Sequence, residues 1–280
     1  MPQILSGTIL RDTIREELRH TISQCTKKPT LVIIQVGDRP DSNTYIKQKK
    51  LFGEYIGAVV THVFFQNSVT RDVLLQEIEK HNNDSNVHGI LVQLPIPKHL
   101  DTERIIEIIN PLKDIDGLTS YNTKLLFNGK GDGHLPATSR SIISLLDFYS
   151  IPIEGKHVVV VGRSNLVGKP TALALLQRDA TVTIAHKETK DLGVITRQAQ
   201  ILVIAIGDPR FINEKYVLPG QTVVDVGINL VEGKLVGDVD FDGVKEIVSA
   251  ISPVPGGVGP MTVASVFQNL LDAYRIQEQL

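Results

Sequence analysis

The chain has 280 residues, of which 42% are hydrophobic and 21% charged, and its formal net charge is -2. This length predicts about two domains, and the balanced charge gives no reason to expect a nucleic acid or a membrane surface as partner. The single cysteine, Cys25, excludes an internal disulfide, and no zinc-ligand spacing occurs. The sequence also lacks a signal-peptide core and an apolar run of membrane length. We therefore expect a cytoplasmic protein without a metal site.

The first half of the sequence alternates apolar runs with helically periodic segments. After an amphipathic helix at 8–21, the predicted elements are a strand at 31–36, a helix to 56 that Asp41 or Ser42 could cap, and then strand 59–65, helix 71–81, strand 88–94 and helix 102–109. This βαβαβ order predicts a parallel sheet with right-handed crossovers. The glycine-rich segment 128–133 follows no strand and contains no Gly-Lys-Ser/Thr, so it is predicted to be a mobile surface loop and not a P-loop.

A second alternation follows a linking helix at 139–149. It comprises strand 157–161, helix 170–178, strand 181–185, helix 189–199, strands 201–206 and 222–226, a hairpin around 231–234 and a closing helix at 262–279. We predict the α/β class with two α/β domains, 1–140 and 141–261, separated by a cleft. Helix 262–280 is expected to pack back on the first domain, because a boundary near residue 140 leaves the first sheet short of cover.

The stretch 158–170 joins the first strand of the second domain to a helix. Four successive valines are typical of a strand buried on both faces. Between Gly162 and Gly168 the chain turns into a helix, whose N-terminal amides and dipole suit a phosphate. The spacing differs from the dinucleotide fingerprint, however, and two glycines can also serve a turn for steric reasons alone. Arg163 favours the phosphate interpretation, because its guanidinium can bind phosphate bidentately.

Several polar residues are expected at the carboxyl edge of the first sheet. Tyr45 and Lys49 lie four apart on one helix face, and Gln93 ends an apolar strand. A solvated face explains the helical pair taken alone, and an Asx turn before glycine explains Asp116 equally well. Convergence at one sheet edge favours a site. The segment 252–262, rich in proline and glycine, suits neither a helix nor a central strand and is interpreted as backbone that approaches a ligand.

Six motifs occur in order along the chain: Tyr-Ile-Lys-Gln-Lys at 45–49, Gly-Ile-Leu-Val-Gln-Leu-Pro at 89–95, Lys-Asp-Ile-Asp-Gly at 113–117, Val-Gly-Arg-Ser-Asn-Leu-Val-Gly-Lys-Pro at 161–170, Asp-Val-Gly-Ile-Asn at 225–229 and Pro-Val-Pro-Gly-Gly-Val-Gly-Pro-Met-Thr at 253–262. Together they resemble the bifunctional methylenetetrahydrofolate dehydrogenase/cyclohydrolase family over essentially the whole chain. The resemblance implies oxidation of 5,10-methylenetetrahydrofolate to the 5,10-methenyl cation with NADP, and hydrolysis of the cation to 10-formyltetrahydrofolate, in one cleft. It implies a folate-binding first domain, a Rossmann-like NADP-binding second domain and a homodimer.

The resemblance also implies residue roles. Lys49 is the catalytic lysine, Tyr45 positions the folate, Gln93 assists Lys49 and Asp116 anchors the pterin. The substrate also contacts Pro255, Gly256 and Gly257, and the cofactor contacts Gly162, Arg163, Ser164, Lys187 and Ile228. Hydration of the cation needs proton transfer, and bringing a lysine from a pKa of about 10.4 to near 7 takes roughly 4 to 5 kcal/mol of destabilised charge. We therefore predict that Lys49 acts as a neutral base chiefly in the cyclohydrolase step.

The sequence departs from the family pattern in two places. Lys187 stands where relatives usually have the serine that touches the ribose 2'-phosphate. A lysine favours that phosphate, although Glu188 opposes it, so NADP is predicted. Segment 136–141 lacks the proline and glycine of its relatives, which is expected to loosen it and leaves the balance of the two activities open.

Two alternatives remain at this stage. An NAD(P)-dependent dehydrogenase of another small substrate explains the second domain but not Tyr45, Gln93 or the proline- and glycine-rich segment. A folate-binding protein with one activity weakened would keep the fold while losing Lys49 or Gln93, and both are present.

Overall fold

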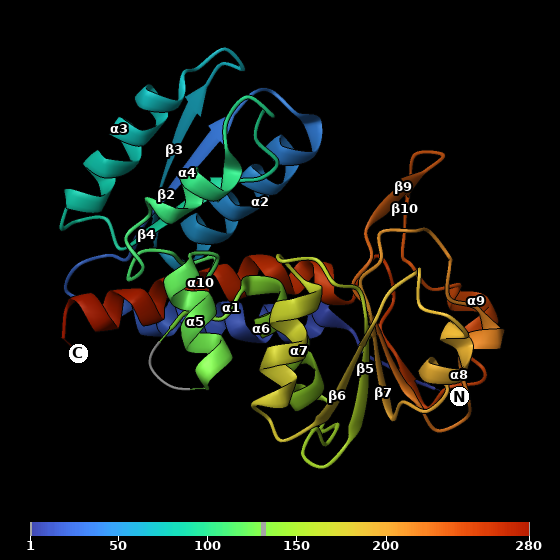
Figure 1. Ribbon diagram of the computed structural model, residues 1–280. Helices are drawn as coiled ribbons and strands as arrows, with labels where there is room; N and C mark the ends of the chain where they lie inside the picture. The colour runs from blue at the N-terminus through green and yellow to red at the C-terminus, as the bar shows by residue number, and fades with distance from the viewer. Residues whose placement is uncertain (1, 130–132, 280) are drawn as a thin grey trace. The chain divides into compact units, whose positions relative to one another are not determined.

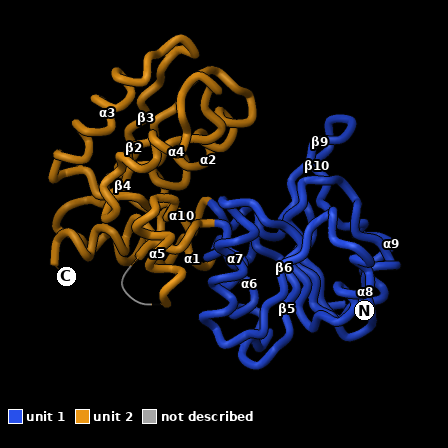
Figure 2. The backbone as a smooth tube through the Cα atoms, in the orientation of Figure 1, with its two compact units in different colours: residues 1–12, 138–262 blue, residues 13–137, 263–280 orange. Residues whose placement is uncertain are grey.

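The computed structural model describes residues 2–129 and 133–279. The chain forms two compact units, one of residues 1–12 and 138–262 and the other of residues 13–137 and 263–280 (Figure 2). The loop predicted at 128–133 is described only at its ends, since residues 130–132 lie outside the described part. No helix within the described residues has both the length and the apolar character needed to span a membrane.

The unit of residues 13–137 and 263–280 is built on a three-stranded parallel sheet in the order β3-β2-β4 (Figure 1). Its strands are β2 (Thr30–Val36), β3 (Val59–Phe65) and β4 (Gly89–Gln93), and its internal helices are α2 (Pro40–Ile56), α3 (Arg71–Asn83), α4 (Thr102–Glu107) and α5 (Ser120–Asn128). The central strand β2 is buried from Leu31 onward, because both of its neighbours and the flanking helices cover it. The predicted βαβαβ order is confirmed.

Helix α10 (Val258–Gln277) contributes its residues from Val263 onward to the same unit. Phe267 stacks on Phe52 of α2 with ring centroids 5.2 Å apart. The Asn269 side-chain amide donates to the carbonyls of Ile115 and Leu135 at 2.7 and 2.8 Å. These contacts connect α10 to α2 and to the segments that follow α4 and α5.

The other unit contains a six-stranded, all-parallel sheet in the order β1-β11-β8-β7-β5-β6. The strands are β1 (Gln3–Ile4), β5 (His157–Val161), β6 (Thr181–Ala185), β7 (Ile201–Ile204), β8 (Thr222–Asp225) and β11 (Ala250–Ile251). The remaining elements are α1 (Gly7–Ser23), which continues beyond the unit, α6 (Ala137–Phe148), α7 (Gly168–Leu176), α8 (Leu192–Thr196), η1 (Glu214–Tyr216), β9 (Asn229–Val231), β10 (Lys234–Val236) and α9 (Phe241–Val244). The four valines of β5 are fully buried, as their pattern predicts.

Three local features differ from the sequence-based expectations. Helix α2 begins at Pro40 after Arg39 and has no side-chain cap, so the expected cap by Asp41 or Ser42 is wrong. Proline replaces that cap, since its fixed φ suits the first helical position and its missing N–H needs no partner. Helix α10 begins at Val258, so the last part of segment 252–262 is helical, with Pro260 in the first turn. Residues 1–12 group with 138–262, because β1 pairs in parallel with β11.

Candidate functional site

Lys49 and Gln93 meet at the carboxyl end of β4. The Lys49 ammonium, Nζ, donates to Gln93 Oε1 at 2.8 Å, and Gln93 Nε2 donates to the carbonyl of Leu94 at 3.1 Å. The second bond fixes the amide so that its oxygen faces the lysine. Lys49 is only 8% exposed, although it lies on a helix whose neighbouring positions 47, 48 and 50 are exposed. The solvated-face interpretation of this lysine is therefore wrong.

Burial and charge act in opposite directions on Lys49. Burial lowers the pKa of its ammonium, and the negative charge of Asp116 partly restores that pKa. Burial likewise raises the pKa of the Asp116 carboxyl, against the effect of Lys49. No ion pair joins the two side chains in the part of the chain that the structure describes. Lys49 is thus a buried amine whose neutral form is made accessible by desolvation, with a carboxylate near enough to influence its charge.

Tyr45 lies one helical turn before Lys49 and is half-buried. Burial raises the pKa of its phenol, and Asp41 adds to that effect, so the hydroxyl is neutral at physiological pH. Within residues 2–129 and 133–279, its hydroxyl forms no hydrogen bond. The ring and hydroxyl of Tyr45 are therefore available to a bound molecule on the helix that carries Lys49.

A buried glutamine that sequence reasoning missed holds the beginning of α2. Gln35 is 2% exposed and pairs in register with Gln93 on the neighbouring strand. Its Nε2 donates to the Gly37 carbonyl at 2.9 Å and to Asn43 Oδ1 at 2.7 Å, while its Oε1 lies 2.9 Å from His62 Nε2. The network fixes the turn between β2 and α2. The available signal was a polar residue near the end of an otherwise apolar strand.

The carboxylate of Asp114, and not that of Asp116, hydrogen-bonds to the segment that follows. Asp114 Oδ2 accepts hydrogen bonds from the Thr119 amide at 2.8 Å and from Asn122 Nδ2 at 2.9 Å. Among the described residues, no group hydrogen-bonds to the Asp116 carboxylate. The carboxylate of Asp116 thus forms no Asx turn with the described residues, and its two oxygens remain available as acceptors.

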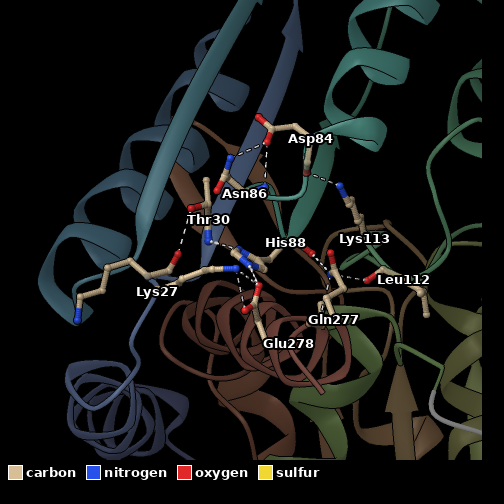
Figure 3. Close-up of polar contacts among 11 residues, drawn as sticks. Lys27, Thr30, Asp84, Asn86, His88, Leu112, Lys113, Gln277 and Glu278 are labelled. Carbon is tan, nitrogen blue, oxygen red and sulfur yellow. Dashed lines mark hydrogen bonds and ion pairs between the residues drawn. The ribbon is translucent and has the colours of Figure 1, made fainter. Parts of the chain in front are cut away.

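Lys113 anchors this carboxylate segment to the rest of its unit. Its ammonium donates to the carbonyls of His81, Asn82 and Asp84 at 3.0, 2.8 and 2.7 Å, and the close-up of this region shows the bond to Asp84 (Figure 3). These carbonyls lie at the end of α3, where a cation is favoured by the helix dipole. Burial lowers the pKa of Lys113, and Asp84 opposes this. The Lys113 side chain therefore connects the end of α3 to the segment that carries Asp116.

Replacing Lys113 by methionine is expected to reduce the free energy of unfolding by about 2 to 3 kcal/mol, because hydrogen bonds to a charged donor are lost from three carbonyls. Urea unfolding followed by circular dichroism measures the change. Lys80→Met is the matched control, since Lys80 on α3 forms only an exposed ion pair with Glu77 and should change the value by less than about 1 kcal/mol. Equal stability of the Lys113 variant and the wild type would show that the hydrogen bonds of Lys113 do not stabilise the fold.

The turn after β5 depends on close approach of two glycines. Gly162 has a φ of +149°, and a Cβ there would collide with the Ala205 carbonyl. A Cβ on Gly168 would collide with the Gly162 carbonyl. The steric interpretation of this spacing is therefore correct in itself. The same close approach places the start of α7 at the carboxyl end of β5, so it is compatible with phosphate binding.

The polar groups around this turn suit an anionic dinucleotide. Ser164 Oγ accepts hydrogen bonds from the amides of Val167 and Gly168 at 3.1 and 3.3 Å, so this serine shapes the start of α7. The side chain of Arg163 is exposed, as is that of Lys187, which follows β6. Because Val161 pairs with Ala185, the two cationic residues follow neighbouring parallel strands at one sheet edge. Two exposed cations that follow neighbouring strands at this sheet edge fit a phosphate-bearing cofactor.

The remaining predicted residues of this unit lie in other loops. Ile228 follows β8 and is 44% exposed. The carbonyl of Gly256 accepts hydrogen bonds from the amides of Gly7 and Thr8 at 2.9 and 3.3 Å. Gly257 is buried and Pro255 is exposed. The proline- and glycine-rich segment therefore has a structural function at the start of α1, which sequence reasoning did not predict.

Segment 136–141 forms the beginning of α6 despite its unusual sequence. Ser139 is fully buried, and its hydroxyl lies 3.0 Å from that of Thr171 on α7. Ser141 is fully buried as well. The segment from Ala137 onward is therefore held by helix formation and by this hydroxyl pair. The structure thus gives no sign of the loosening expected from the sequence.

The sequence matches two domains of one family. Residues 5–116 match the tetrahydrofolate dehydrogenase/cyclohydrolase catalytic domain, and residues 136–278 match the NAD(P)-binding domain of the same family. Lys49, Gln93 and Asp116 fall within the first match, and the turn at 162–168 falls within the second. Within the described residues, no group of three or more His, Cys, Asp or Glu side chains is placed to hold a metal ion.

Individual proteins of this kind are similar over nearly the full chain. The bifunctional protein FolD of Acholeplasma laidlawii is 49% identical over 276 residues, covering 99% of each chain. The structure of the bifunctional methylenetetrahydrofolate dehydrogenase/cyclohydrolase of Campylobacter jejuni has a TM-score of 0.96 at 41% identity, covering 99% of this chain and 100% of that one. The Trypanosoma brucei enzyme, solved with NADP and an inhibitor, has a TM-score of 0.94 at 33% identity and is covered completely, as is this chain. The chain belongs to the tetrahydrofolate dehydrogenase/cyclohydrolase family.

Proposed function

We propose that this protein oxidises 5,10-methylenetetrahydrofolate to the 5,10-methenyl cation with NADP and hydrolyses the cation to 10-formyltetrahydrofolate. The observation that carries the proposal is the Lys49–Gln93 pair, a buried amine with a lowered pKa held at 2.8 Å by an amide oxygen. Such an amine can exist in the neutral form that a general base requires. An NAD(P)-dependent dehydrogenase of another substrate could also use a base, but it would leave Tyr45, Gln93 and the proline- and glycine-rich segment unexplained.

Lys49 accepts a proton from water during hydration of the methenyl cation. Its neutral form is favoured twice, first by burial and then by the positive charge of the cation beside it. Gln93 orients the amine through Oε1, and the bond from Gln93 Nε2 to Leu94 keeps that oxygen in place. Tyr45 positions the folate from the same helix, and Asp116 binds the pterin through its two acceptor oxygens.

The dehydrogenase step depends on orientation more than on acid or base chemistry. NADP, when bound, supplies the hydride acceptor. Gly162, Arg163 and Ser164 at the turn after β5 and Lys187 after β6 would hold the dinucleotide, and Ile228 would contact its nicotinamide part. Pro255, Gly256 and Gly257 contact the substrate with backbone and ring surface. Contacts of this kind would restrict the motion of substrate and cofactor before hydride transfer.

One assay tests the two activities together. The protein is mixed with methylenetetrahydrofolate and NADP, and absorbance follows the reduced cofactor and the methenyl compound separately. Reduced cofactor should appear, and the methenyl signal should then decay. Methenyltetrahydrofolate supplied alone should also be hydrolysed. If the cofactor is reduced but the methenyl signal does not decay, the protein is a dehydrogenase without cyclohydrolase activity. If neither NADP nor NAD is reduced, the dehydrogenase proposal is wrong.

Lys187 is expected to select NADP over NAD. It is exposed and follows β6, and in dinucleotide-binding folds a side chain after this strand contacts the ribose 2'-position. Lys187→Glu should raise KM for NADP by about tenfold or more and reduce the preference for NADP, since a carboxylate repels the 2'-phosphate. Steady-state kinetics with both cofactors measure the ratio of kcat/KM values. Lys156→Glu is the control, because this residue makes the same charge change at the amino end of β5. An unchanged cofactor ratio in the Lys187 variant would contradict the assignment.

We also propose that the protein acts in the cytoplasm as a homodimer, which the family resemblance implies. Light scattering coupled to size-exclusion chromatography tests the oligomeric state. A mass of one chain at working concentration would contradict the homodimer.

A further inference from the structure

Two buried carboxylates in the NAD(P)-binding unit take no part in the chemistry above. Asp225 ends β8 and is 3% exposed, and Asp238 follows β10 and is fully buried. Neither forms an ion pair with any of the described residues. Carboxylates buried without a cation are costly unless other groups hydrogen-bond to them. Their partners therefore indicate what they do.

Asp238 connects the loop after β7 to strand β9. Its Oδ2 accepts hydrogen bonds from the amides of Ile206 and Gly207 at 2.7 and 2.8 Å. Its Oδ1 accepts one from Asn229 Nδ2 at 2.8 Å. One carboxylate thus fixes two adjacent backbone amides at the end of β7 and the first residue of β9.

Asp225 performs the same task for the loop after β8. Its Oδ1 accepts hydrogen bonds from the amides of Gly227 and Asp238 at 2.9 and 3.1 Å, and its Oδ2 accepts one from the Val239 amide at 2.9 Å. The two carboxylates are therefore linked, since the Asp238 backbone is itself a donor to Asp225. Together they receive six hydrogen bonds from three chain segments.

The glycines of these segments are fitted to the carboxylates. A Cβ on Gly227 would collide with the carboxylate of Asp238, and a Cβ on Gly237 would collide with that of Asp225. The chain can therefore follow this path only with glycine at both positions. Ile228, next to Gly227, is 44% exposed on the outer side of the same loop.

We propose that Asp225 and Asp238 are positioning residues for NADP, holding the loops 205–208 and 226–229 at the carboxyl ends of β7 and β8 so that Ile228 is fixed against the bound cofactor. This inference rests on the proposed function. Ligands of open parallel sheets bind outside the carboxyl ends of the strands, where both loops lie. The carboxylates act by accepting hydrogen bonds from the backbone amides of the loops and do not themselves contact the ligand.

Asp238 is the better residue to substitute. The pKa of Asp225 is raised to about 7, mainly by burial and also by the Asp238 charge, although hydrogen bonds from the amides of Val239, Gly227 and Asp238 act to lower it. A variant of Asp225 would therefore change a titrating group as well as a set of hydrogen bonds. Asp238→Asn retains an oxygen for Ile206 and Gly207, and its new amide can donate to Asn229 after rotation of that side chain. Asp238→Ala removes all three acceptor contacts.

Calorimetric titration of the full-length protein with NADP, without folate, gives a readout independent of turnover. Asp238→Ala is expected to raise Kd for NADP by about tenfold or more, and Asp238→Asn should remain within about threefold of the wild type. The dehydrogenase KM for NADP should follow Kd, whereas kcat/KM for hydrolysis of methenyltetrahydrofolate should change by less than about twofold. If the alanine variant does not fold, Gly227→Ala displaces the same loop, keeps both carboxylates and carries the same expectation.

Wild-type affinity for NADP in the alanine variant would overturn the inference. So would an equal fall of both activities, because that pattern would assign the carboxylates a general structural role. Failure of the proposed function can be told apart from failure of this inference. If the wild type binds NADP but does not turn over folate, Kd for NADP can still be compared between the wild type and the Asp238 variants.

Discussion

Lys49→Met is expected to lower the cyclohydrolase kcat by a factor of about 10² to 10⁴, which is the usual contribution of general base catalysis. Methionine fills a similar volume without an amine, so the hydrogen bond to Gln93 is lost while the packing of α2 is kept. The dehydrogenase kcat should fall less, because hydride transfer needs orientation more than proton abstraction. Hydrolysis of methenyltetrahydrofolate and reduction of NADP are measured separately on one preparation.

A neighbouring lysine provides the matched control. Lys47 lies on the same helix but is exposed, so Lys47→Met should leave both activities within about twofold of the wild type. Full cyclohydrolase activity in the Lys49 variant would remove Lys49 as the base. A larger loss of dehydrogenase than of cyclohydrolase activity would assign it to folate positioning instead.

Asp116→Ala is expected to raise KM for methylenetetrahydrofolate by about tenfold or more without reducing stability. The carboxylate has no hydrogen-bond partner among the described residues, so its removal leaves no donor unpaired. Burial raises its pKa, which shows that its charged form is costly at this position. Loss of an anchor to the pterin donors should weaken binding of both folate substrates. Steady-state kinetics and urea unfolding on the same variant measure the two quantities.

Asp114→Ala supplies the contrast two residues away. It removes the acceptor of the Thr119 amide and of Asn122, so the free energy of unfolding should fall by about 1 to 3 kcal/mol. If the Asp116 variant lost stability to the same extent and kept its KM, the carboxylate would be structural, and the pterin would need another anchor.

The elements that the sequence predicted well are those whose pattern is local. Strands β3, β5 and β6 have the predicted bounds, because runs rich in β-branched and aromatic residues that end at turn residues mark strands, whether buried as in β5 or partly exposed as in β3 and β6. Strands β1 and β11 were missed, since two residues carry no period and their pairing joins positions about 250 residues apart. Helix α5 was missed because it buries only Asn122 and leaves Phe127 72% exposed, so it shows no apolar face.

The candidate site divides in the same way. Lys49 and Gln93 follow from helical spacing and from the end of a strand, and the structure brings them together. The supporting residues Gln35, Lys113 and Asp238 were not predicted, because Lys113 and Asp238 bond to backbone groups about 30 residues away and Gln35 bonds to the side chain of His62, 27 residues away. A single sequence does not show which carbonyl or amide a buried polar side chain will meet. For Gln35 the local signal was a polar residue within an apolar strand.

The most direct test of this account is the pH dependence of cyclohydrolase kcat/KM in the wild type and in Asp116→Asn. A neutral base predicts activity that rises with pH through the pKa of Lys49, at a midpoint below the ordinary lysine value of about 10.4. Asp116 raises that pKa, so its neutralisation should move the midpoint to lower pH. The account is contradicted if the rising limb persists in Lys49→Met, or if the midpoint of the Asp116 variant stays in place or moves to higher pH.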